Sequence, residues 1–156
     1  MSSIFFYNTR TRKKEPFRPI QEGRVGIYTC GPTVYGPQHI GNVRSQLFAD
    51  LLKRFLSSEG FEVTHVINIT DVGHLVSDGD EGEDKMELAA QRAGESAEEI
   101  AGRYTESWRR DRRAVNCLEP EFNPKATDHI TEQIELGVRL DEGGYLYRID
   151  DGIYFD

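Results

Sequence analysis

Two side chains that could take part in chemistry, Cys30 and His39, lie on either side of a turn that begins Gly31-Pro32. A histidine beside a helix start can stabilise charge that develops on a transferring phosphate, and a cysteine thiolate can bind zinc. Zinc needs at least three protein ligands, however, and no Cys-x-x-Cys or close histidine pair accompanies Cys30. Taken singly, each residue is also explained by packing, because histidines cap helices and free cysteines are commonly buried.

A strand and a helix must position these two side chains. Residues 25–28 predict a short buried strand that ends just before Cys30. After His39, apolar residues recur at helical spacing and predict a helix: Leu47, Phe48, Leu51, Leu52, Phe55 and Leu56. The unpaired N–H groups and the dipole at the start of that helix favour an anion there.

A second strand completes this unit. Gly60 suits the left-handed residue past the end of the helix, and residues 61–69 alternate with β-branched side chains. A strand, a helix and a strand in this order predict two parallel strands with a right-handed crossover. Because ligands of such sheets bind outside the carboxyl ends of the strands, we expect Thr70 on the same rim as Cys30 and His39.

The second half of the chain predicts two more helices. A capping box from Ser96 to Glu99 opens the first, and Thr127 is expected to cap the second, which ends at the glycines 143–144. The side chains expected to face inward are Ile100, Tyr104 and Trp108 in the first helix and Ile130, Ile134 and Val138 in the second.

Shorter elements surround these helices. Residues 119–123 predict a short third strand between two prolines, and residues 145–149 and 153–155 flank a turn signal and predict a β-hairpin. The acidic stretch 78–84 predicts a solvated loop, because the glycine and closing glutamate of a calcium-binding EF-hand are missing from it.

Composition excludes several classes of protein. With 19 Lys plus Arg against 27 Asp plus Glu, the formal charge of the 156 residues is −8, which argues against non-specific binding of nucleic acid. No segment approaches the roughly 18 apolar residues that span a bilayer, and two cysteines are too few for a disulfide scaffold. We therefore expect a cytoplasmic protein of one domain without a membrane partner.

Several motifs occur together in a fixed order. They are Tyr28-Thr29-Cys30-Gly31-Pro32-Thr33-Val34-Tyr35, His39-Ile40-Gly41-Asn42 and Asn68-Ile69-Thr70-Asp71, followed by shorter ones at 94–96, 125–130 and 151–156. From Arg24 to its last residue, the chain resembles the N-terminal catalytic part of cysteinyl-tRNA synthetase, a class I aminoacyl-tRNA synthetase.

The resemblance implies specific roles for these residues. His39, Ile40, Gly41 and Asn42 would occupy the HIGH signature, which binds ATP, with His39 and Asn42 catalytic; the family usually has histidine where this chain has Asn42. Cys30 would be the first of four zinc ligands, in a site that selects cysteine through its thiolate. The residues expected to line the cysteine pocket are Gly31, Thr33 and Thr70.

The resemblance also implies a fold. It is an α/β fold: the first half of a Rossmann-like (HUP-type) parallel nucleotide-binding sheet with helices on its faces, ending in a β-hairpin. The nucleotide-binding unit would span 24–72, the acidic loop 73–95, the helices 96–143 and the start of a β-hairpin insertion 144–156.

The family's other zinc ligands, its KMSKS loop, the second half of its nucleotide fold and its anticodon domains find no match in this chain. We therefore expect a fragment or truncated product that activates cysteine poorly or not at all by itself, although its parent would use cysteine, ATP and tRNA(Cys). Pairing with a complementary half, or self-association, is expected. Two alternatives are a related ligase that joins cysteine to an amino sugar and a non-catalytic binding module.

Overall fold

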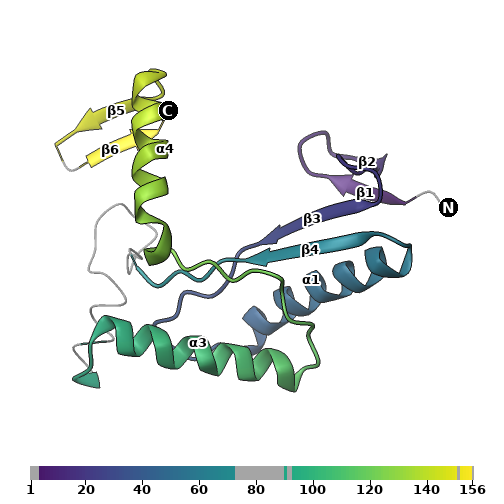
Figure 1. Cartoon of the computed structure of the whole chain (residues 1–156), viewed down its shortest axis with the longest axis horizontal. Coiled ribbons are helices and arrows are strands. Elements are labelled where there is room, and N and C mark those ends of the chain that lie inside the picture. The colour runs from purple at the N-terminus through teal and green to yellow at the C-terminus, as the bar shows by residue number, and fades with distance from the viewer. Residues whose placement is uncertain (1–3, 73–89, 91–92, 151, 156) are drawn as a thin grey trace.

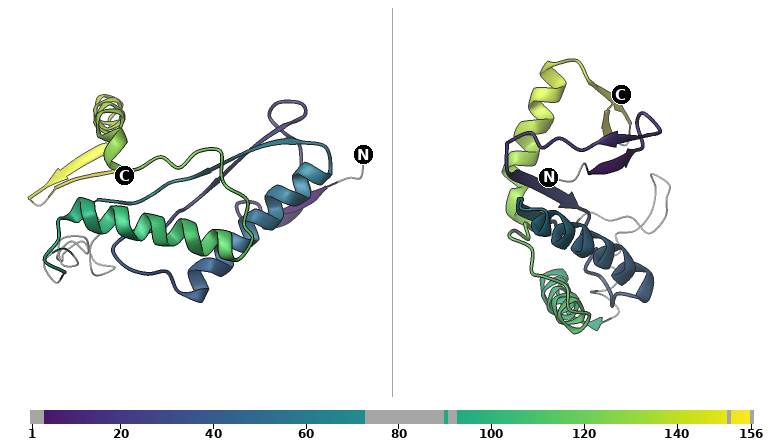
Figure 2. Two further views of the ribbon diagram at one scale, coloured as in Figure 1. Left: turned by 60° about the horizontal axis from the view of Figure 1, so that its bottom comes forward. Right: turned by 90° about the vertical axis from the view of Figure 1, so that its right-hand side faces the viewer.

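The computed structural model describes residues 4–72, 90, 93–150 and 152–155. The elements in chain order are β1 (Phe5–Asn8), β2 (Lys13–Pro16), β3 (Arg24–Thr29), α1 (Ile40–Ser58), β4 (Glu62–Ile67), α3 (Ala97–Ala114), the 3₁₀ helix η1 (Thr127–His129), α4 (Ile130–Glu142), β5 (Leu146–Ile149) and β6 (Gly152–Phe155). This is an α/β arrangement. Helices α1 and α3 lie on one side of β3 and β4, with β1–β2 at one end and α4 with β5–β6 at the other (Figures 1 and 2).

The strand–helix–strand unit forms as the sequence predicts. β3 and β4 pair in parallel, with Val25 opposite Val63 and Tyr28 opposite Val66. Gly60 has φ +92°, the left-handed conformation expected just past the end of α1. The carboxyl ends of both strands therefore point toward the same rim, where the chain turns from β3 into α1.

The predicted third strand is present only as an extended segment beside β4. Isolated parallel bridges join Val66 to Phe122 and Ile69 to Lys125, and the Ile69 amide donates to the carbonyl of Pro124 at 2.8 Å. The prolines lack the N–H groups that a regular ladder requires, which explains why the pairing stays discontinuous.

Helix α1 buries a different face from the one its apolar residues suggest. Its buried residues are Gln46, Ala49, Asp50, Lys53 and Leu56. Phe48, Leu51 and Phe55 are 70%, 64% and 43% exposed. The helix was predicted from apolar spacing, but its inner face is largely polar because each buried polar side chain finds a distant partner.

The core lies between β4 and α3. Its buried members are Val34, Ile67, Ile69, Ile100, Ala101 and Trp108. The capping box is formed: the Glu99 amide donates to the Ser96 hydroxyl, and the Ser96 amide donates to the Glu99 carboxylate. Tyr104 packs against the core as well, so the inward face predicted for this helix is confirmed.

The prediction for α4 is wrong in two respects. Ile130, Ile134 and Val138 are 43%, 62% and 51% exposed, because only β5 and η1 pack closely against this helix among the described elements. Thr127 does not cap α4; His129 occupies the N-cap position without a side-chain bond, and Thr127 lies in η1.

The hairpin of β5 and β6 is antiparallel, with Leu146 opposite Phe155, as predicted. The hairpin of β1 and β2 was not predicted. It is joined to the rest of the fold through Phe17, whose ring contacts Phe6 and Phe61 edge to face at centroid distances of 5.3 and 5.9 Å. The acidic stretch 78–84 lies outside the described residues, and no described helix is long and apolar enough to cross a membrane.

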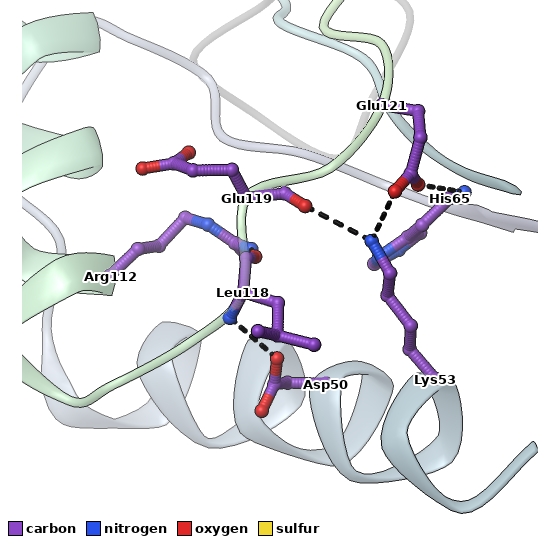
Figure 3. Close-up of polar contacts among 7 residues, drawn as sticks. All are labelled: Asp50, Lys53, His65, Arg112, Leu118, Glu119 and Glu121. Carbon is purple, nitrogen blue, oxygen red and sulfur yellow. Dashed lines mark hydrogen bonds and ion pairs between the residues drawn. The ribbon is translucent and has the colours of Figure 1, made fainter. Parts of the chain in front are cut away.

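A buried polar network joins α1 to β4 (Figure 3). The Lys53 ammonium is 2.7 Å from a Glu121 carboxylate oxygen and donates to the carbonyl of Glu119 at 3.0 Å. The other Glu121 oxygen accepts the His65 amide at 2.6 Å. Burial alone would raise the pKa of Glu121, but these hydrogen bonds and the Lys53 charge lower it overall.

His65 is expected to make the chain less stable in weak acid. Burial first, and then the charges of Lys53 and Arg112, lower the pKa of His65 against smaller opposing effects of Glu121 and Asp50. The unfolded chain therefore binds this proton at higher pH than the folded chain, so stability falls as pH drops below the ordinary value of about 6.5.

The measurement is urea unfolding at several pH values between about 5.5 and 7.5, for wild type and His65→Gln. One group contributes at most about 1.4 kcal/mol per pH unit, and the wild-type free energy of unfolding should fall more steeply with acidification than that of the variant. Parallel pH profiles would contradict the assignment to His65.

Candidate functional site

The segment between β3 and α1 is held against the end of β4. The Gly31 amide donates to the side-chain carbonyl of Asn68 at 3.0 Å. The Val34 amide donates to the Thr70 carbonyl at 3.2 Å, and the Thr70 amide donates to the Pro32 carbonyl at 3.0 Å. Val34 itself is fully buried, so the two motifs 28–35 and 68–71 form one structural unit.

At the start of α1, His39 is the N-cap residue. Its Nδ1 accepts the Gly41 amide at 3.0 Å, while the side-chain oxygen of Asn42 accepts the His39 amide at 3.1 Å. Because Nδ1 is an acceptor, the neutral ring carries its proton on Nε2. Asn42 likewise uses its oxygen in the cap, which leaves its amide hydrogens as donors.

A small polar cavity of about 220 Å³ lies between these two elements. The predicted site residues that line it are Cys30, Gly31, Thr33, His39 and Asn42. Ile40, Gly41 and Thr70 are not among its lining residues: Ile40 is 82% exposed, and the Thr70 hydroxyl accepts a hydrogen bond from Asn68. The cavity brings the thiol and the imidazole to one opening.

Sequence reasoning missed two residues of α1 that line the cavity, Ser45 and Gln46. The Ser45 hydroxyl donates to the Asn42 carbonyl, and the Gln46 side chain accepts the Trp108 indole N–H at 3.0 Å. Their spacing of three and four residues from Asn42 puts them on the same helix face, a signal present in the sequence.

Asp71 links two distant motifs. Its carboxylate accepts the Thr127 amide at 3.0 Å and the Thr127 hydroxyl at 2.6 Å. The motif at 125–130 therefore lies beside the motif at 68–71. Thr127 joins the two motifs, whereas the sequence predicted it as a helix cap.

The donor set for a metal is incomplete in the described part of the chain. Cys30 is exposed and lines the cavity, whereas Cys117 is buried and its pKa is raised chiefly by that burial. No group of three or more His, Cys, Asp or Glu side chains is placed to hold a metal ion among the residues described. A zinc ion does not fit Cys30 with those residues alone.

Gly41 is expected to be required for the orientation of the His39 ring. A Cβ at Gly41 would lie 2.8 Å from Cε1 and 3.0 Å from Nδ1 of His39, so Gly41→Ala must displace the ring. The loss of about 1 kcal/mol from the cap is offset by the similar helix preference of alanine over glycine, so stability should change little.

The ¹⁵N and ¹H resonances of the His39 ring report this change, because Nδ1 loses its N–H donor. Gly102→Ala is the matched control, since its added Cβ meets nothing within 4 Å in helix α3. A His39 ring spectrum unchanged in Gly41→Ala would contradict the capping geometry.

Comparison with known proteins assigns the class. Residues 16–156 match the family described as tRNA synthetases class I (C) catalytic domain, and the chain belongs to this family. It is similar to Cysteine--tRNA ligase 1 of Burkholderia lata, with 59% identity over 98% of this chain and 33% of that protein. For Cysteine--tRNA ligase of Zymomonas mobilis the identity is 46%, over 98% of this chain and 30% of the relative.

The resemblance to cysteinyl-tRNA synthetase is thus confirmed, and the chain spans about a third of the length of the curated relatives it matches. A solved structure, the ternary complex of Agrobacterium radiobacter K84 LeuRS, tRNA and LeuAMS, superposes with a TM-score of 0.64. The match covers 85% of this chain and 16% of the LeuRS chain, at 22% identity. At that identity it supports the α/β fold alone.

Proposed function

We propose that this chain forms the part of a cysteine–tRNA ligase that activates cysteine with ATP to cysteinyl-adenylate, which the complete enzyme transfers to tRNA(Cys). The observation that carries the proposal is the capped His39, which lines the same cavity as Cys30 and whose cap uses Nδ1 and leaves Nε2 out of the capping bond. The 59% identity to Cysteine--tRNA ligase 1 of Burkholderia lata supports the choice of amino acid.

Within this proposal, residues 39–42 bind ATP. The carboxylate of cysteine attacks the α-phosphorus of ATP, the bond to the β-phosphate oxygen breaks, and pyrophosphate leaves. Negative charge on the phosphate oxygens is stabilised by the Nε2–H of His39, the amide hydrogens of Asn42 and the start of α1. These donors are held before ATP arrives, because the cap fixes both side chains.

The other end of the cavity would receive the cysteine substrate. Gly31 and Thr33 line it, and Thr70 fixes the backbone behind it. We propose Cys30 as one zinc ligand whose companions come from outside the described residues. The donor set among the described residues does not fit the metal.

The remaining part of the fold belongs to the same proposal. β3, β4 and the segment 122–125 would be half of a Rossmann-like nucleotide-binding sheet within the unit 24–72 and its neighbours. The exposed apolar faces of α1 and α4 would then be covered by the rest of a cytoplasmic polypeptide of the relatives' length.

A chimera tests this proposal. Residues 1–156 replace the matching third of the Burkholderia lata ligase, and cysteine-dependent exchange of pyrophosphate into ATP is measured for the chimera and for the isolated chain. We expect exchange by the chimera and little or none by the chain alone. A folded chimera without exchange would refute the proposal and leave a non-catalytic binding module.

The acceptor needs a separate assay. The full-length polypeptide that carries this chain is expected to charge tRNA(Cys). Ligation of cysteine to an amino sugar, with no charging of tRNA, would instead identify the related thiol-biosynthesis ligase.

A further inference from the structure

His65 is a polar side chain in the middle of the fold. It is 1% exposed and lies in β4 opposite Ile27 of β3. Its Nε2 is 2.9 Å from the hydroxyl oxygen of Thr29, which is two residues further along β3 on the same sheet face. The ring therefore reaches diagonally toward the carboxyl end of β3, where the cavity opens.

The backbone of His65 is fixed from the other side. Its amide donates to the Glu121 carboxylate at 2.6 Å, and its carbonyl accepts the amides of Glu121 and Phe122 at 3.0 and 3.3 Å. Glu121 is in turn paired with Lys53 of α1 (Figure 3). The backbone that carries the imidazole is thus connected through Glu121 and Lys53 to α1. The first residues of α1 line the end of the cavity that is proposed to bind ATP.

Cys30 lies between two residues that are bonded to β4 and to the residue that follows it. On one side, Thr29 is bonded through its hydroxyl to His65; on the other, the Gly31 amide is bonded to Asn68. The thiol itself is exposed, so these neighbouring bonds, rather than packing, set the position of the backbone that presents it.

We propose that His65 is a positioning residue for the amino-acid end of the cavity, acting through the Thr29 hydroxyl on Cys30 and Gly31. The role of that end in binding cysteine rests on the proposed function. The bond itself and its effect on residues 29–31 do not.

The first test therefore needs no activity. Amide hydrogen exchange at Gly31 is measured by NMR in this chain for Thr29→Val, which keeps the side-chain shape, and for His65→Leu. Exchange at Gly31 should accelerate about tenfold, the effect of one net hydrogen bond, while the amides of α3 exchange at unchanged rates. Thr29→Ser and His65→Gln keep a hydrogen-bonding group and should exchange near the wild-type rate.

A double variant separates positioning from general destabilisation. Thr29→Val combined with His65→Leu should exchange at Gly31 no faster than the more affected single variant, because both remove the same bond. Unchanged exchange at Gly31, or acceleration that spreads equally to α3, would overturn the proposal. If His65→Leu fails to fold, the comparison of Gly31 amide exchange between Thr29→Val and Thr29→Ser still tests the proposal.

The second test uses the chimera with the same substitutions. Thr29→Val should raise the KM for cysteine about tenfold and leave the KM for ATP within about twofold, because His39 and Asn42 are held by the capping box of α1 and not by residues 29–31. Equal changes in both constants would refute positioning of the amino-acid end. An inactive wild-type chimera would refute the proposed function alone, since the exchange measurement at Gly31 stands without it.

Discussion

Gly31→Ala is expected to destabilise the chain by about 3 kcal/mol or more, at the upper end of what overpacking costs. A Cβ at Gly31 would overlap the carbonyl oxygen of Asn68, lie 2.8 Å from its carbonyl carbon and lie 3.0 Å from Cγ2 of Ile67. The first two contacts are with backbone, which cannot rotate away as a side chain would.

The substitution also removes a hydrogen bond. If β3 and β4 separate to admit the methyl group, the Gly31 amide moves away from the Asn68 side chain that accepts it at 3.0 Å. That amide is partly buried, so an unpaired donor adds about 1 kcal/mol to the steric cost.

Gly26→Ala is the matched control for this prediction. Gly26 lies in β3, its added Cβ meets nothing within 4 Å, and its φ is outside the left-handed region. Urea unfolding followed by circular dichroism should therefore show a change below about 0.5 kcal/mol for Gly26→Ala. Similar midpoints for the two variants would show that the close approach of Gly31 to Asn68 does not stabilise the fold.

The sequence predicts the elements that depend on local signals. The capping box at Ser96 and the left-handed Gly60 each depend on a few neighbouring residues, and the strand–helix–strand order of 25–69 depends on three short patterns. The structure confirms these predictions, although not from the apolar face of α1. Local signals also indicate the cavity residues Cys30 and His39. Cys30 comes directly after the end of β3, and His39 comes directly before the start of α1.

The sequence does not predict features of the fold that depend on residues far away along the chain, such as the buried polar face of α1. Gln46, Asp50 and Lys53 are buried because they bond to the Trp108 indole, to the Leu118 amide and to Glu121, all more than 60 positions later. Their residue types alone favour solvent exposure. The same limit applies to α4, whose amphipathic pattern does not reveal whether a partner covers its apolar face.

His39→Asn is expected to lower cysteine-dependent pyrophosphate exchange by the chimera about 10²- to 10³-fold, the usual effect of removing one donor to developing charge. Asparagine is among the most favourable N-cap residues, so its side-chain oxygen can still accept the amide that His39 Nδ1 accepts at 3.0 Å. The substitution therefore removes the Nε2 donor while it preserves the start of α1.

The control is the same substitution at a second helix. His129 is the N-cap residue of α4, where its side chain makes no capping bond and lies away from the cavity lining. His129→Asn should leave the exchange rate within about twofold of wild type, and both variants should unfold at wild-type urea concentrations.

Full exchange by His39→Asn would show that no phosphate oxygen depends on the imidazole. Equal losses in the two variants would show instead that the effect is not specific to the cavity. A loss confined to His39→Asn would place the effect on the Nε2 proton of His39, because asparagine keeps a capping acceptor at that position.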